Sequence, residues 1–286
     1  MTVKDALRAA TDELRSADVD SPEHDAEVLL RHVLGWDRAR VLTDGDADLS
    51  REAEESFRGL VKQRAARRPL QHLTGIQWFW KHEFTVTAEV LVPRPETELL
   101  VEAGLDLLRE VERPRIVDVG TGSGCIALSL AAERPDAEVH AIDISGPALA
   151  VARENALRMG LEAQVTFHLG DLLGPLPHLA GEVDLVVSNP PYVDSAELPS
   201  LAPEVREHDP ERALVPPGDR VSLYRRLGPE AAELLRPGRW LGVEIGQGMS
   251  DEVTRVLQPA GLRVERVVPD LAGIPRALIA VRPAGE

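Results

Sequence analysis

A chain of 286 residues is long enough for one large domain and a smaller one, and 43% hydrophobic with 28% charged residues is ordinary for a globular protein. The net charge of −16 argues against a protein that tracks duplex DNA, because such proteins present a basic face. No apolar run approaches the roughly twenty residues that span a bilayer, and the N-terminus lacks an apolar signal core. We therefore expect a cytoplasmic protein with no membrane partner and no direct nucleic-acid binding. The single cysteine excludes an internal disulfide, and the scattered histidines predict no metal site.

Residues 1–74 carry a helical pattern. One helix has Pro22 at its first position and ends at Gly35, and another begins after Ser50 and stops before Pro69. The pattern predicts a small helical bundle, which either docks a substrate or only braces the rest of the chain.

A short basic run, residues 62–68, lies on the last of these predicted helices. Charge runs on amphipathic helices are usually solvated faces, and we interpret this one so. The alternative is a contact for a partner or a nucleic acid.

The periodicity changes at residues 75–92, where aromatic and β-branched residues alternate with polar ones. This alternation predicts a β-hairpin linker. Its tryptophans, Trp78 and Trp80, either help to wall a nearby pocket or serve ordinary packing. Helical and strand patterns then alternate through residues 93–286, which predicts an α/β domain with a mostly parallel sheet.

The first strand of that domain, residues 115–119, runs into a glycine-rich turn and a helix over residues 125–133. The turn is Gly120-Thr121-Gly122-Ser123-Gly124. Strand, glycine-rich turn and helix begin a Rossmann-like unit, in which glycines let a ligand approach the backbone at the helix N-terminus. Cys125 starts this helix, and we interpret it as a small core residue in preference to an activated thiol.

Acidic residues follow the next two predicted strands. Asp143 ends the strand over residues 137–142, about twenty residues beyond the glycines, where a carboxylate can accept from both hydroxyls of a ribose. Asp171 follows the strand over residues 165–169, where it can bind the exocyclic amine of an adenine.

A fourth strand, residues 183–188, leads into Asn189-Pro190-Pro191-Tyr192. The motif places a carboxamide at the carboxyl end of a strand, with two prolines fixing the backbone and an aromatic ring as a flat wall. Such a site suits a planar NH2 group whose two hydrogens must be held. Residues 199–217 then read as a long loop beside Asn189, and later strands are expected at 240–245, 263–268 and 277–281.

These motifs resemble those of S-adenosylmethionine-dependent methyltransferases of the Asn-Pro-Pro-Tyr group, and within it the bacterial release-factor glutamine methyltransferases. Further segments carry the resemblance: Arg68 to Gly75, Leu91 to Glu98, Val205 to Pro210, Glu244-Ile245-Gly246 and Asp270 to Gly273. The resemblance covers nearly the whole chain and is weakest over about the first sixty residues.

The resemblance implies a Rossmann-like class I methyltransferase domain whose last strands form a hairpin. It also implies binding of S-adenosyl-L-methionine by Gly120, Thr121, Gly122, Ser123, Gly124, Asp143, Asp171, Leu172 and Asn189. The substrate would be the Gly-Gly-Gln glutamine of class-I peptide chain release factors, bound by Asn189, Pro190, Pro191 and Tyr192. Leu172 departs from the pattern, since some relatives carry an aromatic residue there, and Asp209 stands where a Glu is expected.

For catalysis we expect the Asn189 side-chain oxygen and the Pro190 carbonyl each to accept one amide hydrogen, while Tyr192 packs on the amide plane. The proton then leaves to water or to an acceptor for which Glu207, Asp209 and Glu244 are candidates.

Two other substrates share this chemistry. One is a glutamine of a ribosomal protein, which is the substrate of a sister family that shares the Asn-Pro-Pro-Tyr motif. The segment Pro93 to Thr97 resembles the release-factor enzymes and not that sister family. The other is the amino group of adenine in nucleic acid, which the acidic charge disfavours.

Overall fold

The computed structural model describes residues 1–284, and the chain folds into two units. The smaller comprises residues 1–76 and 201–208, and the larger comprises residues 77–200 and those from Asp209 on. The expected domains were 1–74, 75–92 and 93–286, of which residues 285 and 286 lie outside the described part. No local sequence pattern indicates that an internal segment, 201–208, belongs with the N-terminal helices.

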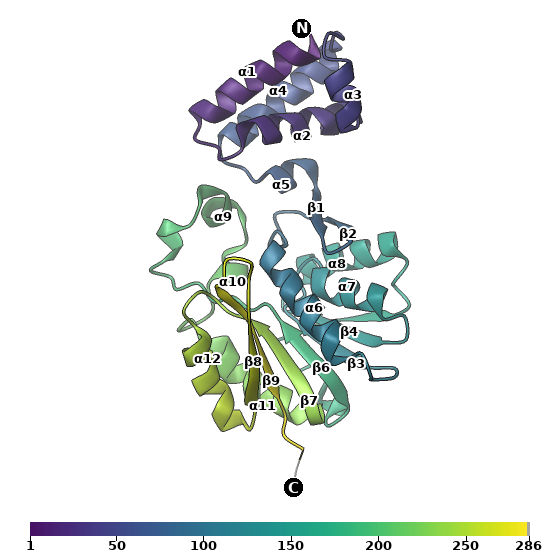
Figure 1. Cartoon of the computed structure of the whole chain (residues 1–286), viewed down its shortest axis with the longest axis vertical. Coiled ribbons are helices and arrows are strands. Elements are labelled where there is room, and N and C mark those ends of the chain that lie inside the picture. Colours follow the sequence, from purple (N-terminus) through teal and green to yellow (C-terminus); the bar gives the residue numbers. More distant parts are fainter. Residues whose placement is uncertain (285–286) are drawn as a thin grey trace. The chain divides into compact units, whose positions relative to one another are not determined.

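The smaller unit is helical because its apolar residues recur every three or four positions. In the first helix these are Val3, Ala6, Ala10 and Leu14, all buried. Its helices are α1 (Val3–Ser16), α2 (Pro22–Leu34), α3 (Arg38–Thr43), α4 (Arg51–Ala65), α5 (Leu70–Thr74) and α9 (Pro203–His208). Helices α1, α2 and α4 pack on one another (Figure 1) around an apolar core.

The predicted helix limits at Pro22 and Gly35 are confirmed. Pro22 is the first helical residue, and Gly35 ends the helix in the left-handed conformation, with φ 62. The prediction of one long loop over residues 199–217 is wrong, because this segment contains two helices, α9 and α10 (Glu211–Leu214). Each of these helices is short, so no periodic pattern reveals it.

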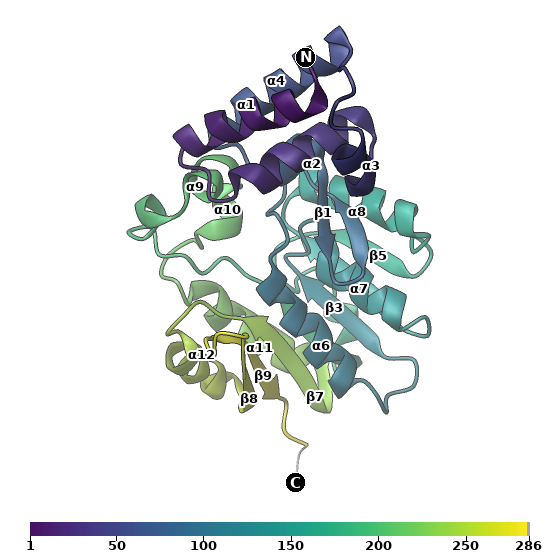
Figure 2. The same ribbon diagram turned by 45° about the horizontal axis from the view of Figure 1, so that its top comes forward.

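The larger unit contains a seven-stranded sheet in the order β5-β4-β3-β6-β7-β9-β8. The strands are β3 (Arg115–Val119), β4 (Glu138–Asp143), β5 (Val165–Leu169), β6 (Val183–Ser188), β7 (Leu235–Glu244), β8 (Arg263–Pro269) and β9 (Pro275–Val281). Strands β3 to β7 are parallel, and β9 runs antiparallel between β7 and β8 (Figure 2). The expected parallel sheet with a C-terminal hairpin is thus confirmed.

Helices cover both faces of this sheet. The longer ones are α6 (Glu98–Leu107), α7 (Cys125–Glu133), α8 (Gly146–Met159), α11 (Ser222–Leu234) and α12 (Ser250–Leu257). Side chains of one strand alternate between two apolar clusters: on β6, Val186 packs with α11 and α12, whereas Leu185 and Val187 pack with α6 and α7. Burial on both faces explains why β6 has apolar residues at successive positions from Leu185 to Val187.

The predicted hairpin is confirmed as a two-stranded sheet of β1 (Ile76–Phe79) and β2 (His82–Thr85). The buried aromatic residues are Phe79 in β1 and Phe84 in β2, whereas Trp78 is 66% exposed. Among residues 1–284, no helix combines the length and the apolar character that a membrane crossing requires.

Candidate active site

The strand order reverses at β3, which lies between β4 and β6. Open α/β sheets bind their ligands outside the carboxyl ends of the strands at such a point. A cavity of about 880 Å³ opens there, within the usual range for small-molecule sites. The predicted site residues that line it are Gly120, Thr121, Gly122, Ser123, Asp143, Asp171, Leu172, Asn189, Pro190 and Pro191.

The backbone of the glycine-rich turn has a conformation that favours glycine. Gly120, Gly122 and Gly124 all have positive φ, with values of 73, 56 and 84. Gly124 does not line the cavity, and its role is packing: a Cβ there would lie 2.9 Å from a methyl carbon of Leu128. The turn is tied to the neighbouring strand, because the Gly122 N–H donates to Asp143 Oδ2 at 2.9 Å.

Asp143 lies at the end of β4, where the backbone fixes its carboxylate. Its second oxygen accepts from the Ser145 N–H at 2.8 Å. A carboxylate has about four lone-pair positions, so both oxygens keep capacity for a ligand's hydroxyls.

The segment after β5 forms the opposite wall of the cavity. Asp171 is exposed and pairs with Arg226 at 2.5 Å. Leu172 is buried with φ 48, a left-handed conformation that costs a non-glycine residue of the order of 1–2 kcal/mol. Strained backbone of this kind is concentrated at ligand sites, and here it turns an apolar side chain into the cavity wall.

Asn189 follows β6, and a side chain that the sequence analysis passed over fixes its carboxamide. Asn189 Nδ2 donates to Thr97 Oγ1 at 3.1 Å. The Thr97 hydroxyl gives its single proton to Glu244 Oε2 at 2.5 Å. Because that proton is committed, Thr97 can only accept from the amide, so the NH2 group faces Thr97 and Asn189 Oδ1 is free to accept.

Glu244, at the end of β7, accepts a second hydrogen bond from the Tyr192 hydroxyl at 3.1 Å. Burial raises the pKa of Glu244 to about 7, against hydrogen bonds from Thr97 and Tyr192 that lower it. Gly246 allows the Tyr192 ring to approach, since a Cβ there would lie 3.0 Å from a ring carbon. Tyr192 therefore supports Glu244 and does not line the cavity, where a flat wall was expected.

None of the three candidate proton acceptors lines the cavity. Both oxygens of Glu244 accept from hydroxyls. Asp209 is buried against Arg94 at 2.5 Å, and burial raises the pKa of its carboxyl to about 6. Glu207 belongs to the N-terminal unit.

Two further titratable groups, Asp118 and Cys125, are buried near the glycine turn, and Cys125 also lines the cavity. Burial raises the pKa of the Cys125 thiol to about 12, so this cysteine is a core residue without thiolate character, as expected. Asp118 is also buried, which raises its pKa to about 7; its Oδ2 accepts from the Thr121 hydroxyl at 2.7 Å. Within residues 1–284, no group of three or more His, Cys, Asp or Glu side chains is arranged to hold a metal ion.

The tryptophans of the hairpin do not line the cavity. The wall on that side is built by the segment that follows the hairpin: Glu89, Val90, Leu91, Pro93, Arg94 and Thr97. Thr97 appears in the sequence analysis only as the end of the segment Pro93 to Thr97, with no role assigned to it at the site.

Comparison with known proteins yields consistent matches. Residues 5–75 match the family model described as the PrmC N-terminal domain, and residues 95–219 match the methyltransferase small domain. The release factor glutamine methyltransferase of Deinococcus radiodurans is 45% identical over 285 residues, covering 100% of both chains. That of Moorella thermoacetica is 44% identical over 283 residues, covering 99% of both. The solved hMettl16 catalytic domain shares the fold, with a TM-score of 0.57, 18% identity, and coverage of 70% of this chain and 75% of that one.

Proposed function

Because the chain belongs to the release factor glutamine methyltransferase family, we propose that it methylates the side-chain amide nitrogen of the Gly-Gly-Gln glutamine in class-I peptide chain release factors. The methyl donor in this proposal is S-adenosyl-L-methionine, and the place of action is the cytoplasm. The observation that carries the proposal is the Asn189 carboxamide, oriented by Thr97 and facing a nucleoside-sized cavity.

The cavity suits this donor. The turn from Gly120 to Ser123 gives close access to backbone N–H groups at the start of α7, and Asp143 has lone pairs left for the two ribose hydroxyls. Leu172 and Ile144 add apolar surface for the adenine, and the Asp171 carboxylate lines the same cavity and can accept from the exocyclic amine. When bound, S-adenosyl-L-methionine supplies a methyl group activated by its sulfonium.

Orientation is the main requirement of the reaction. A glutamine amide nitrogen is a weak nucleophile, because its lone pair is delocalised into the carbonyl. Asn189 Oδ1 accepts one amide hydrogen and the Pro190 carbonyl accepts the other, which aims the nitrogen and stabilises the positive charge that develops on it. The nitrogen then loses its extra proton to water, since the three candidate carboxylates do not line the cavity.

The helical unit would dock the release factor outside the glutamine loop. Its match to the N-terminal domain of the family supports this assignment. Thr97, Glu244 and Tyr192 act as positioning residues for Asn189 and need no contact with the substrate.

The test is transfer of a labelled methyl group from S-adenosyl-L-methionine to a purified class-I release factor. A Gln→Ala version of its Gly-Gly-Gln loop is the matched control, with a ribosomal protein and a single-stranded nucleic acid as parallel acceptors. We expect label only in the intact release factor. Equal labelling of the Gln→Ala protein, or label confined to another acceptor, would refute the proposed substrate.

A further inference from the structure

The last peptide of the glycine-rich turn is held from outside the turn. Ser123, which lines the cavity, lies between two glycines with positive φ, Gly122 at 56 and Gly124 at 84. Glycine changes its backbone conformation at little cost, so steric contacts alone do not fix this part of the chain. The Gly124 N–H donates to the Thr121 carbonyl at 2.8 Å. The Ser123 carbonyl, in the same peptide unit, accepts from Asn155 Nδ2 at 2.9 Å.

The Asn155 carboxamide has a second partner, which fixes the way it faces. Asn155 lies in α8 and is only 1% exposed. The N–H of Thr85, the last residue of β2, donates to Asn155 Oδ1 at 2.7 Å, and Asn155 Nδ2 donates to the Thr85 carbonyl at 3.0 Å. A backbone N–H only donates and a carbonyl only accepts, so this pair admits one orientation of the carboxamide. One hydrogen of Nδ2 then remains for Ser123.

Helix α8 and strand β2 are also joined by other side chains. Arg158, in the same helix, donates to the Glu83 carboxylate at 2.8 Å and to the Thr85 hydroxyl. Four buried apolar residues pack the segment that follows the hairpin against α8: Val86, Val90, Ala148 and Val151. The support of the Asn155 carboxamide is therefore fixed, and its free hydrogen points to Ser123 in one direction.

A turn held in advance binds a ligand better than one that the ligand has to order. The free energy needed to order backbone on binding is subtracted from the free energy of binding. Glycines make this cost larger, because they lose more conformational freedom than other residues. The hydrogen bond from Asn155 to Ser123 restricts the turn before any ligand is present.

The geometry points to Asn155 as a positioning residue for the methyl donor: by bridging β2 and the Ser123 carbonyl, its carboxamide holds the glycine-rich turn in one conformation before the donor binds. The identity of the donor rests on the proposed function, whereas the ordering of the turn does not depend on it. The hairpin, expected as a linker, thus contributes to the donor site through its backbone at Thr85 and not through its tryptophans.

The test compares Asn155→Ser with Gln164→Ala. A serine is too short to reach the turn, and its hydroxyl can bond the carbonyl of Val151 in its own helix, which favours a folded variant. The Gln164 carboxamide also donates to two backbone carbonyls, those of Ala131 and Arg134, but at the other end of α7. The control therefore removes the same kind of bridge away from the glycine turn.

Calorimetric titration with S-adenosylhomocysteine gives the first readout. We expect binding about tenfold weaker for Asn155→Ser and within about twofold of the parent for Gln164→Ala, as when about one residue of backbone has to be ordered on binding. KM for S-adenosyl-L-methionine should rise by the same factor in Asn155→Ser, while kcat at saturating donor stays near the parent value. Equal weakening in both variants, or unchanged binding in Asn155→Ser with only a lower melting temperature, would overturn the inference.

Hydrogen exchange of the unliganded protein gives the second readout. Asn155→Ser should lose protection over residues 121–125, which include the Gly124 N–H, and Gln164→Ala should keep it. Unchanged protection in Asn155→Ser would contradict the assigned role. If the parent protein does not bind S-adenosylhomocysteine, the proposed function fails, and the exchange result still decides whether Asn155 orders the turn.

Discussion

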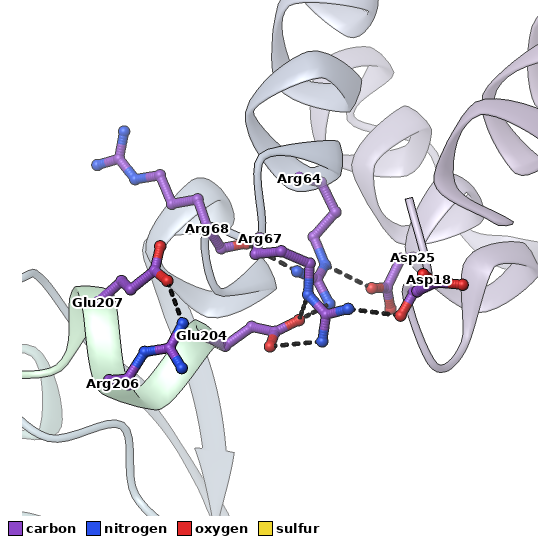
Figure 3. Close-up of polar contacts among 8 residues, drawn as sticks. All are labelled: Asp18, Asp25, Arg64, Arg67, Arg68, Glu204, Arg206 and Glu207. Carbon is purple, nitrogen blue, oxygen red and sulfur yellow. Dashed lines mark hydrogen bonds and ion pairs between the residues drawn. The ribbon is translucent and has the colours of Figure 1, made fainter. Parts of the chain in front are cut away.

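Two glutamates of this protein, Glu244 buried and Glu204 half-buried, are held in opposite ways. Glu244 accepts from the hydroxyls of Thr97 and Tyr192, and burial raises its pKa to about 7. Glu204 is held by the guanidinium groups of Arg67 and Arg64 (Figure 3). Burial is the largest single influence and raises the pKa of its carboxyl, but the hydrogen bonds from Arg67, Arg64 and the backbone together bring that pKa below its ordinary value.

The difference lies in what each contact has to do. A carboxylate between two arginines stays ionised over the working pH range and serves as a fixed anchor. A buried carboxylate between neutral hydroxyls has a pKa close to neutral pH. When it is ionised it can only accept, so each hydroxyl must donate to it, and this fixes the direction of the next hydrogen bond, the one between Thr97 and Asn189. Glu244 thereby orients Asn189 through Thr97, whereas Glu204 holds a helix in place.

Asn189→Ala should have the largest effect, because it removes the group that Glu244 and Thr97 orient. We expect kcat to fall by about a hundred- to a thousandfold, as when one preorganised hydrogen-bonding partner is removed from an active site. Affinity for S-adenosyl-L-methionine should survive at least in part, since the glycine turn and Asp143 are untouched. Single-turnover methyl transfer and calorimetry measure the two quantities, and near-normal turnover would remove Asn189 from the mechanism.

Thr97→Val should come next. It keeps the shape of the side chain but leaves Asn189 Nδ2 and Glu244 Oε2 without their partner, and the carboxamide is then free to turn. A loss of about 1–3 kcal/mol corresponds to a kcat lower by about ten- to a hundredfold. Thr97→Ser retains the hydroxyl and is the matched control, for which we expect activity near the parent value. Equal losses in both variants would indicate a packing role for Thr97.

The rate should also report the ionisation of Glu244. Only the carboxylate forces Thr97 to donate toward it, so kcat should rise with pH, with a midpoint near the Glu244 pKa of about 7. Glu244→Gln should have a lower kcat and lack this step. Asp118 titrates in the same range, also at about 7, but it is buried near the glycine turn and would show in cofactor affinity. A pH step in kcat that persists in Glu244→Gln would exclude Glu244 as its source.

Stability should change with pH in opposite directions at the two glutamates. The folded pKa of Glu204 is lowered, so its contribution is present above its unfolded pKa and is lost as the pH falls through the folded value. The folded pKa of Glu244 is raised, so its contribution is present below its unfolded pKa and is lost as the pH rises through about 7. In urea titrations, Glu204→Gln should therefore differ most from the parent at neutral pH. Glu244→Gln should gain on the parent as the pH rises, and parallel curves for both variants would contradict this assignment.

The sequence by itself determined the α/β sheet and, to within one residue, the carboxyl ends of its strands, whereas β7 begins at Leu235 and not at the expected residue 240. The mainly apolar run from Val183 to Ser188 predicts a buried strand, and glycines at positive φ can hardly be replaced by other residues. These local signals also placed Asp143 and Asn189 at strand ends, and the topology rule for open sheets brings such ends together. The cavity at that edge has both residues in its lining.

The tertiary structure decided what depends on partners far along the chain. Thr97 contacts Asn189 across 92 positions and Glu244 across 147, and no local pattern encodes such a pairing. The basic run at residues 62–68 looked like a solvated face because its carboxylate, Glu204, lies 137 positions beyond Arg67. The fold follows from the periodicity of neighbouring residues. Long-range tertiary contacts, which form only when the chain folds, determine the direction of the hydrogen bond at Asn189 and hold α9 to the N-terminal helices.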